Sequence, residues 1–461
     1  MSPASPRRAA WSIALAGTLL RLCVAPSYGY LGADGDLIEH KQAVHLALTQ
    51  GFARLYVPSA TNDPALTGQE WNGGFFINNL PLILYLRAAL GLVYQRFEPE
   101  AVALWDSRLN YFELEKTDLR ERLAASRGFT VLLKLPGIVA DAGIVLALAL
   151  YGGTLAPWTG LGAAAAYAFN PGIVFDTAFW GQHDSVWVGL VVWSLVALSR
   201  GHATVAWTAL ALACLTKPQA WAFGPLVLVL SLLRFPRREW IRAAGAAAAL
   251  TLLLFLPFLL RGTLTASLDA LCRSTFGGEP FVSCNAANLW WLLAGGRGYE
   301  MRDDIPLAGP ITPRALGLLG FLSVCVLVLR DLARHGADLR RLFLGAAVVG
   351  MGFFTFVTEL HENHMIAVIP LLAFAAGRDG RVWALFAALS VTLLGNMALF
   401  DPAVTAPLAG WLGVSELPIR ALSLALAAGN VAAFLALSAV LLGSRSRAET
   451  PPVECAEHGS V

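Results

Sequence analysis

The stretch AAGAAAALTLLLFLPFLL, residues 243–260, contains no charged side chain. A helix that crosses a hydrocarbon core of roughly 30 Å needs about 20 such apolar residues. Arginines crowd the segment just before it, 234–242. The same alternation recurs along the chain, which is 57% hydrophobic and only 14% charged. A water-soluble fold could not cover so much apolar surface, so the sequence predicts an all-α, polytopic transmembrane helical bundle.

Further apolar runs mark the other predicted spans. Because backbone amides in lipid must find hydrogen-bond partners within their own segment, each run is expected to be a helix. The prediction is a bundle of about 11–13 membrane helices. They are drawn from the runs 9–27, 75–95, 129–151, 157–178, 186–200, 203–216, 219–234, 241–260, 313–330, 341–358, 365–377, 381–400 and 418–443.

The positions of the basic residues predict the orientation, because Arg and Lys favour the cytoplasmic side. Clusters such as 234–242 and 330–341 are assigned inside. Counting crossings from the two ends of the chain gives opposite sides for Gln182. A segment between 75 and 180 is therefore expected not to cross fully, either at half-helices around Pro171 or in 97–127. We assign Gln182 to the outside, together with the loops 28–74, 261–312, 359–364 and 401–417.

Two other interpretations of the charges are set aside. The formal net charge of +2 is too small to indicate a nucleic-acid partner. Arg7 and Arg8, followed by an apolar run, are compatible with a secretory signal. Arg21 interrupts that run, so an uncleaved first helix is the expectation.

Ionisable residues at membrane depth are costly, and four groups of them indicate function. The first, LGADGDLIEHKQAVH at 31–45, follows the first span, and two carboxylates one residue apart can share a metal or divide base and positioning roles. The second, FNPGIVFDTAFWGQHDS at 169–185, leaves no room for a solvated loop and indicates a cavity. The alternatives without a functional role are a capped, solvated loop for the first group and a helix cap for the second.

The third group, ALACLTKPQAWAFGP at 211–225, contains Lys217 in a chain that mostly uses arginine. A compact ammonium there indicates a contact with one anionic group, with a snorkelling anchor as the alternative. The fourth group, TFVTELHENHMIAVIP at 355–370, contains His361 and His364. If the turn is helical, these two share one face and could hold a metal with a carboxylate. We expect all four groups to face one outer cavity.

Two cysteines fall in the predicted outward loop 261–312. An oxidising compartment favours disulfides. We therefore predict a Cys272–Cys284 bridge.

In these motifs the sequence resembles the GT-C superfamily of polytopic glycosyltransferases that use polyprenyl-phosphate sugars. Within it, the sequence is similar to the dolichyl-phosphate-glucose glucosyltransferases and to bacterial mannosyltransferases related to the second GPI mannosyltransferase. The resemblance rests on GDLIEHKQ at 35–42, INNLPLILYL at 77–86, GQHDS at 181–185, TKPQ at 216–219 and HENH at 361–364. It implies a GT-C-like bundle with interfacial helices in the first outer loop. It also implies a catalytic module, 1–376, followed by C-terminal helices and a tail, 377–461.

The resemblance implies a hexosyltransferase, with mannose as the expected sugar, in a bacterial inner membrane with the active site facing the periplasm or exterior. The expected partners are a polyprenyl-phosphate sugar donor, a lipid-linked or glycan acceptor and membrane lipids. Asp36 matches the general base of an inverting displacement, with Asp34 as backup, and a divalent Mg or Mn ion at Asp34 and Asp36 is an option rather than a firm cofactor. The expected substrate-binding residues are Glu39, His40, Asn78, Asn79, Gln182, His183, Asp184, Lys217, Gln219, His361, Glu362 and His364.

Lys217 is expected to bind the phosphate of the donor, with Asp184 as its partner in the empty site. A rival of a different class is a secondary transporter, since intramembrane carboxylates and broken helices also mark solute paths. Transporters tend to show an internal repeat, and none of the four motifs has a second copy. The sequence therefore favours the enzyme.

Overall fold

The structure is a computed structural model that describes residues 4–27, 29, 36–56, 80–98, 126–153, 157–275 and 278–443. Within these ranges helices dominate, and extended backbone is limited to isolated bridges. The predicted all-α fold is confirmed for the described part of the chain. The first helices are α1 (Ala4–Val24), α2 (Asp36–Gln50), a 3₁₀ turn (Phe52–Arg54), α3 (Pro81–Phe97), α7 (Arg127–Tyr151), α8 (Pro157–Ala168) and α9 (Pro171–Val174).

The middle and the end of the chain continue in the same way. A π-helical turn (Phe175–Trp180) leads into the next part of the bundle. The elements after it are α10 (Asp184–Ser199), α11 (Ala203–Cys214), a 3₁₀ segment (Pro218–Phe223), α12 (Gly224–Arg234), α13 (Arg237–Leu260), α14 (Leu264–Thr275), α15 (Leu289–Leu293), a 3₁₀ turn (Gly298–Glu300), α16 (Pro313–His335), α17 (Leu339–Phe356), α18 (Val368–Ala376), α19 (Gly380–Leu399), α20 (Pro402–Leu412) and α21 (Ile419–Gly443).

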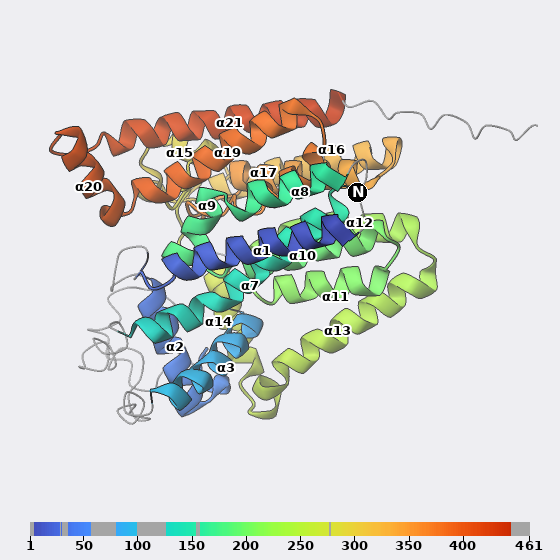
Figure 1. Ribbon diagram of the computed structural model, residues 1–461, viewed down its shortest axis with the longest axis horizontal. Helices are drawn as coiled ribbons and strands as arrows, with labels where there is room; N and C mark the ends of the chain where they lie inside the picture. Colours follow the sequence, from blue (N-terminus) through green and yellow to red (C-terminus); the bar gives the residue numbers. More distant parts are fainter. Residues whose placement is uncertain are drawn as a thin grey trace, which may run out of the picture.

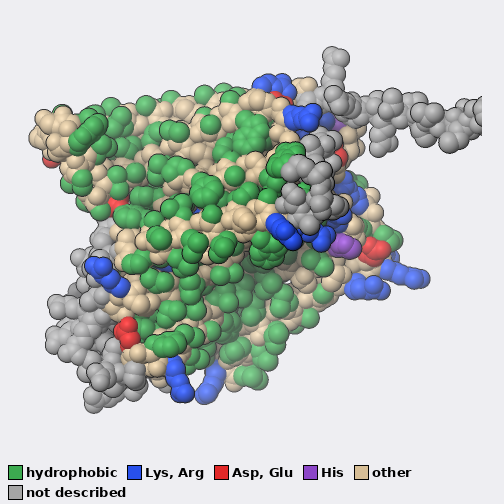
Figure 2. Space-filling model, viewed as in Figure 1, with side chains coloured by type: hydrophobic (Ala, Val, Ile, Leu, Met, Phe, Trp, Pro, Cys, Tyr) green, Lys and Arg blue, Asp and Glu red, His purple; other side chains and the backbone are tan. Residues whose placement is uncertain are grey.

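Among the described residues, six helices are long and apolar enough to cross a membrane: α7, α13, α16, α17, α19 and α21. Their surroundings differ. In its most apolar window α17 is 78% buried inside the protein, whereas α13 is only 11% buried. A helix that is apolar all round must be enclosed by protein or by lipid. α17 is thus a core helix and α13 a lipid-facing one, in line with the apolar flank of the bundle in Figure 2.

Close packing in the core depends on glycine at the contact between α16 and α17. A Cβ atom at Gly352 would lie 2.7 Å from the Val324 side chain, and one at Gly345 would lie 2.9 Å from Val328. Small residues at such positions let two membrane helices approach closely. This contact fixes α17 against α16. It therefore also fixes the position at which the turn after Phe356 begins.

The apolar run 157–178 is broken, as one of the two alternatives for this region predicts. Pro171 cannot donate a backbone hydrogen bond, and it occupies the first position of α9. The side chain of Asn170 caps that helix by accepting from the amides of Gly172 and Ile173 at 3.0 and 3.3 Å. The break lets the chain form the π-helical turn and then the polar segment 181–185.

The ends of the helices gather at two opposite ends of the bundle (Figure 1). The start of α1 and the turn from α12 to α13 lie at one end, where Lys and Arg side chains also gather in Figure 2, and α2 and α20 lie at the other. α3 lies beside α2 and is not among the helices long enough to cross. The Gln182 side chain contacts Asp36 at the start of α2, so the two lie at the same end of the bundle. The assignment of that end to the outside stays a prediction.

The C-terminal helices form a layer along one side of the bundle (Figure 1). α21 packs on α17 and α19, and the Asn430 side chain donates to the carbonyl of Ala287 at 2.9 Å. The division into 1–376 and 377–461 stays a prediction.

Candidate active site

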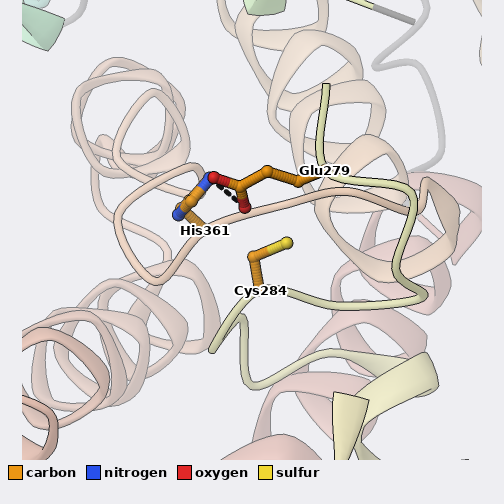
Figure 3. Close-up of side chains that lie close together, drawn as sticks. All are labelled: Glu279, Cys284 and His361. Carbon is orange, nitrogen blue, oxygen red and sulfur yellow. Dashed lines mark ion pairs between the residues drawn. The ribbon is translucent and has the colours of Figure 1, made fainter. Parts of the chain in front are cut away.

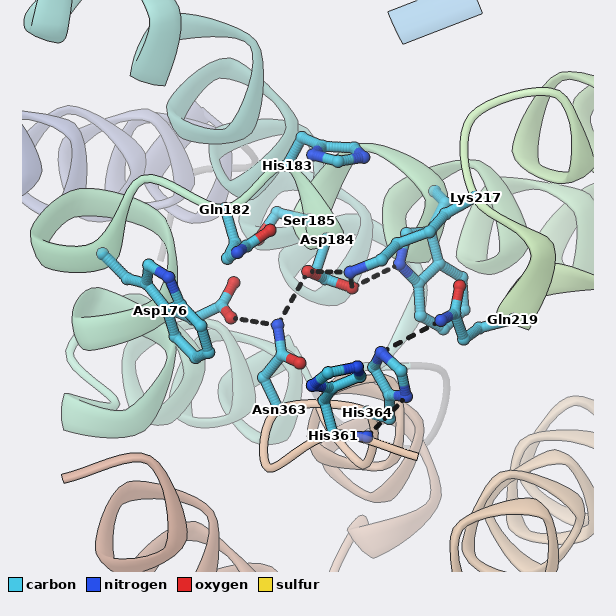
Figure 4. A network of polar contacts seen from close by, with 12 residues as sticks. Asp176, Gln182, His183, Asp184, Ser185, Lys217, Gln219, His361, Asn363 and His364 are labelled. Carbon is cyan, nitrogen blue, oxygen red and sulfur yellow. Dashed lines mark hydrogen bonds and ion pairs between the residues drawn. The ribbon is translucent and has the colours of Figure 1, made fainter. Parts of the chain in front are cut away.

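The polar segments that follow the π-helical turn, α11 and α17 come together in the bundle (Figure 4). The start of α2 joins them through the contact between Asp36 and Gln182. Asp184 is the first residue of α10, Lys217 precedes the 3₁₀ segment that follows α11, and Asn363 lies in the turn between α17 and α18. The three side chains are linked directly. Segments that are far apart in the sequence therefore build one site.

The centre of this site is an ion pair between Lys217 and Asp184. The ammonium donates to both carboxylate oxygens of Asp184, at 2.9 and 2.8 Å. Trp187 donates to the same carboxylate at 2.7 Å, and Asn363 donates to it at 3.0 Å. Asp184 is fully buried, while the Lys217 side chain remains 16% exposed. The pairing of Lys217 with Asp184 is confirmed.

A second buried carboxylate, Asp176, lies on the π-helical turn and was not singled out from the sequence. Asn363 donates to its Oδ1 at 3.1 Å and so joins Asp176 to Asp184 (Figure 4). Oδ2 of Asp176 has no hydrogen-bond partner among the described residues. Its position in an otherwise uncharged apolar run was the signal that could have revealed it. Asn363 likewise lies inside the HENH motif but was not expected to contribute.

Asp36 is the first residue of α2 and faces the end of the π-helical turn. Its Oδ2 accepts a hydrogen bond from the Trp180 indole at 3.1 Å and another from the Gln182 amide. A carboxylate in the first turn of a helix is also favoured by the helix dipole. The two hydrogen bonds hold the Asp36 carboxylate in a fixed orientation.

Arg87 on α3 was also missed, and it is fully buried beside the predicted residue His183. Its Nη2 lies 2.9 Å from His183 Nδ1. A guanidinium can only donate, so Nδ1 is the acceptor and the proton of neutral His183 lies on Nε2. Asp36 and Asp184 are both within electrostatic range of Arg87. The His40 ring packs edge-on against that of His183, with centroids 6.0 Å apart.

Several buried polar atoms in this group of residues lack hydrogen-bond partners. Nε and Nη1 of Arg87, Nε2 of His183 and Nε2 of His40 have no hydrogen-bond partner among the described residues. A buried polar group without a partner costs about 1–3 kcal/mol, more when it is charged. The arrangement is therefore suited to a ligand that brings acceptors and negative charge.

The turn between α17 and α18 positions the other two predicted histidines. His364 Nδ1 accepts from the backbone amide of His361 at 3.1 Å, so the proton of neutral His364 is on Nε2. That nitrogen lies 3.0 Å from the side-chain amide of Gln219. The amide oxygen must therefore face the ring, because two donors cannot share this bond. Both ring nitrogens of His364 are engaged, which contradicts the option of a metal held jointly by His361 and His364.

His361 instead faces Glu279, a residue of the segment between α14 and α15. Its Nε2 lies 3.1 Å from Glu279 Oε2, and its Nδ1 lies 3.9 Å from Glu362 Oε2. Burial lowers the pKa of His361, but the hydrogen bond and charge of Glu279, together with Glu362, raise it to about 9. His361 is thus an imidazolium at neutral pH when only these carboxylates surround it.

The remaining predicted residues have different outcomes. Glu39 is half-buried on α2 and Glu362 is buried in the turn. Asp34, Asn78 and Asn79 lie outside the described residues, so their roles stay predictions.

The predicted disulfide is contradicted by the structure. Cys272 is exposed on α14, whereas Cys284 is buried, and both are free thiols. The Cys284 sulfur points toward Glu279 and His361 (Figure 3). Proximity along the chain did not bring the two sulfur atoms together, because one cysteine lies on the exposed side of a helix and the other is buried in the protein.

A distant likeness to a solved structure is found among known proteins. No protein-family model matches the sequence, and no curated protein matches it. Among solved structures, the chain is similar to ArnT from Cupriavidus metallidurans, in a crystal structure bound to undecaprenyl phosphate. The two chains share 13% sequence identity, and the likeness covers 94% of this chain and 77% of ArnT with a TM-score of 0.46. A likeness this distant assigns neither a family nor an activity to the chain.

Proposed function

We propose that the chain is a membrane glycosyltransferase. It would transfer a hexose, mannose or glucose, from a polyprenyl-phosphate-linked donor to a lipid-linked or other acceptor on the outer face of the membrane, with inversion at the anomeric carbon. The observation that carries the proposal is the group of buried donors without partners, Arg87, His40 and His183, beside Asp36 and Lys217. The bacterial inner membrane and the outward orientation belong to the same proposal.

The proposed donor accounts for the positive part of the site. The phosphate of a lipid-linked sugar carries negative charge and several acceptor oxygens, and Arg guanidinium groups match that geometry. Lys217 adds a compact positive charge, and its side chain is 16% exposed while that of Asp184 is fully buried. A lipid donor also explains why these groups lie at membrane depth, since its phosphate enters from the bilayer.

Asp36 is the general base in this proposal. In a direct displacement, the acceptor hydroxyl oxygen forms a bond to the anomeric carbon and loses its proton to Asp36, while the bond from that carbon to the phosphate oxygen breaks. The departing electron pair increases the charge on the phosphate, which Arg87 and Lys217 stabilise. Gln182 and Trp180 hold the Asp36 carboxylate in place.

The other predicted residues have the following roles in this proposal. Gln219 and His364 are bonded to each other and would orient the turn at His361 and Asn363 rather than titrate. Glu39, Glu362, Asn78 and Asn79 stay predicted sugar or acceptor contacts. An Mg or Mn ion at Asp34 and Asp36 stays a prediction as well.

The test uses the full-length protein in proteoliposomes with a panel of polyprenyl-phosphate hexoses. Sugar transfer to an extracted lipid fraction is the expected result. Movement of the lipid-linked sugar or of a soluble sugar across the bilayer without transfer would support the transporter instead. Absence of both activities across the panel would contradict the proposal.

Arg87 gives the test a specific variant. Arg87→Met should weaken binding of a polyprenyl phosphate about 10–100-fold, because it removes at least one charge-assisted hydrogen bond. Arg96→Met is the matched control, since Arg96 lies on the same helix but is exposed. Equal binding by both variants and the wild type would exclude Arg87 from the phosphate site.

A further inference from the structure

A second group of side chains lies beside the candidate active site. Glu279, Cys284 and His361 each offer a ligand atom, and these atoms all lie within 4.8 Å of one another (Figure 3). The residues come from two segments that are separated by α15, α16 and α17. The proposed glycosyl transfer does not require this group.

The backbone holds the two segments in register. The amide of Cys284 donates to the carbonyl of Leu360 at 2.9 Å, and the amide of Glu359 donates to the carbonyl of Phe281 at 3.0 Å. Asn285 and Glu359 adopt left-handed backbone conformations, with φ values of 63° and 61°. Such conformations cost of order 1–3 kcal/mol each and persist where the surroundings fix them. The ligand positions are therefore set by the fold and not by chance contacts of flexible side chains.

The chemistry of the three ligands is specific. A thiolate, an imidazole and a carboxylate are the ligands that zinc and related first-row transition metals prefer, whereas magnesium and calcium prefer oxygen atoms alone. A thiolate and a carboxylate together balance the charge of a divalent cation.

The surroundings of His361 fit metal ligation as well. Its Nε2 points toward Glu279 and its Nδ1 lies 3.9 Å from the Glu362 carboxylate. A metal-bound histidine commonly directs its second ring nitrogen to a carboxylate, which fixes the ring and increases its basicity. We propose that Glu279, Cys284 and His361 bind a divalent transition-metal cation of the zinc class, with a fourth position left open.

This site would join the outer loop 278–285 to the turn 359–364. That turn carries Asn363, which bonds both Asp176 and Asp184, and His364, which bonds Gln219. The cation would thus lock the turn that completes the candidate active site. Three protein ligands with an open fourth position are also the arrangement of catalytic zinc sites. The metal site is separate from the Mg or Mn option at Asp34 and Asp36.

The test measures metal binding directly and needs no sugar substrate, so its outcome is independent of the proposed transfer reaction. Purified full-length protein is stripped with a chelator, desalted and titrated with Co²⁺ under reducing conditions. We expect one Co²⁺ per chain and a near-ultraviolet band from charge transfer between sulfur and cobalt. Zn²⁺ should displace the Co²⁺ and abolish the band.

Variants assign the ligands. Cys284→Ser should lose the charge-transfer band, while Cys272→Ser, the matched control in the same outer region, should keep it. Glu362→Gln should weaken affinity about 10–100-fold without moving the band, as expected for a residue that only orients a ligand. Glu279→Gln, which keeps the shape of the side chain, should weaken binding and serves as a second ligand variant if Cys284→Ser does not fold.

Two results would overturn the proposal. One is wild-type protein that binds no stoichiometric Co²⁺ or Zn²⁺. The other is Co²⁺ binding with the same band in Cys284→Ser and the same affinity in Glu279→Gln, which would place the metal elsewhere.

Discussion

Two buried ion pairs in this bundle differ in what surrounds them. In the first, Arg21 Nε lies 2.6 Å from Asp141 Oδ2, and both side chains are 1% exposed. Tyr167 donates to the other oxygen of Asp141 at 2.6 Å, and Arg21 also donates to the carbonyl of Ala168 at 2.7 Å. In the second, Lys217 pairs with Asp184 but keeps 16% of its side chain exposed. Asp176 and Arg87, which lie close by, retain polar atoms without partners.

The comparison separates a structural pair from a binding site. Removing a charge from water costs several kcal/mol, and that cost is recovered when good geometry satisfies both partners. The Arg21–Asp141 pair links α1, α7 and α8 and is 1% exposed on both sides, although Nη2 of Arg21 has no hydrogen-bond partner among the described residues. The polar atoms around Lys217 remain partly unsatisfied, which is a cost unless a ligand brings the missing partners. Changes at the first pair should therefore affect stability, and changes at the second should affect activity.

The largest effect is expected at Asp36. Asp36→Asn keeps the shape of the side chain but cannot accept a proton, so transfer should fall roughly 10²–10⁴-fold with normal expression. Single-turnover rates measured with saturating donor would show this loss. Normal turnover in Asp36→Asn with an inactive Asp34→Asn would reverse the two roles, and wild-type rates in both would exclude the first outer loop as the catalytic region.

Arg21 tests the structural side of the comparison. Arg21→Met leaves Asp141 buried without its cation, and we expect a loss of about 3–5 kcal/mol in the free energy of unfolding. Thermal unfolding in detergent checks this value. The double variant Arg21→Met with Asp141→Leu should recover much of the loss, because it removes the unpaired charge. A stable Arg21→Met protein with impaired donor binding would mean that this pair is not purely structural.

The smallest of these effects is expected at Lys217. Lys217→Met should raise the apparent KM for the donor and lower kcat, with a combined loss of about 1.5–3 kcal/mol in transition-state stabilisation. Lys217→Arg should restore only part of it, because a planar fork replaces a compact charge. The unfolding free energy should change less than in Arg21→Met. Unchanged kinetics in Lys217→Met would instead identify Lys217 as an anchor.

The sequence predicted the parts of this molecule that depend on local patterns. The apolar runs predicted the helices, and Pro171 predicted the break in the run 157–178. The cost of burying a lysine predicted that Asp184 is the partner of Lys217. Arg87 and Asp176 were missed because each is a single charge within an apolar run, and the sequence does not show which face of a helix the neighbours cover. Glu279 was missed because its contact with His361 depends on the conformation of the segment between α14 and α15, which a local sequence pattern does not predict. The disulfide was wrong for the same reason.

The π-helical turn Phe175–Trp180 has a consequence for the tolerated length of the chain. In this turn the amide of Gly181 donates to the carbonyl of Asp176, five residues earlier, at 3.0 Å. A π-helical turn holds one residue more than an α-helical turn, and one residue of α-helix corresponds to a rotation of about 100°. Deleting a residue such as Ala178 would let the turn close as an α-helix and would rotate Asp176 away from Asn363. The segment should therefore accept many substitutions but no change in the number of its residues.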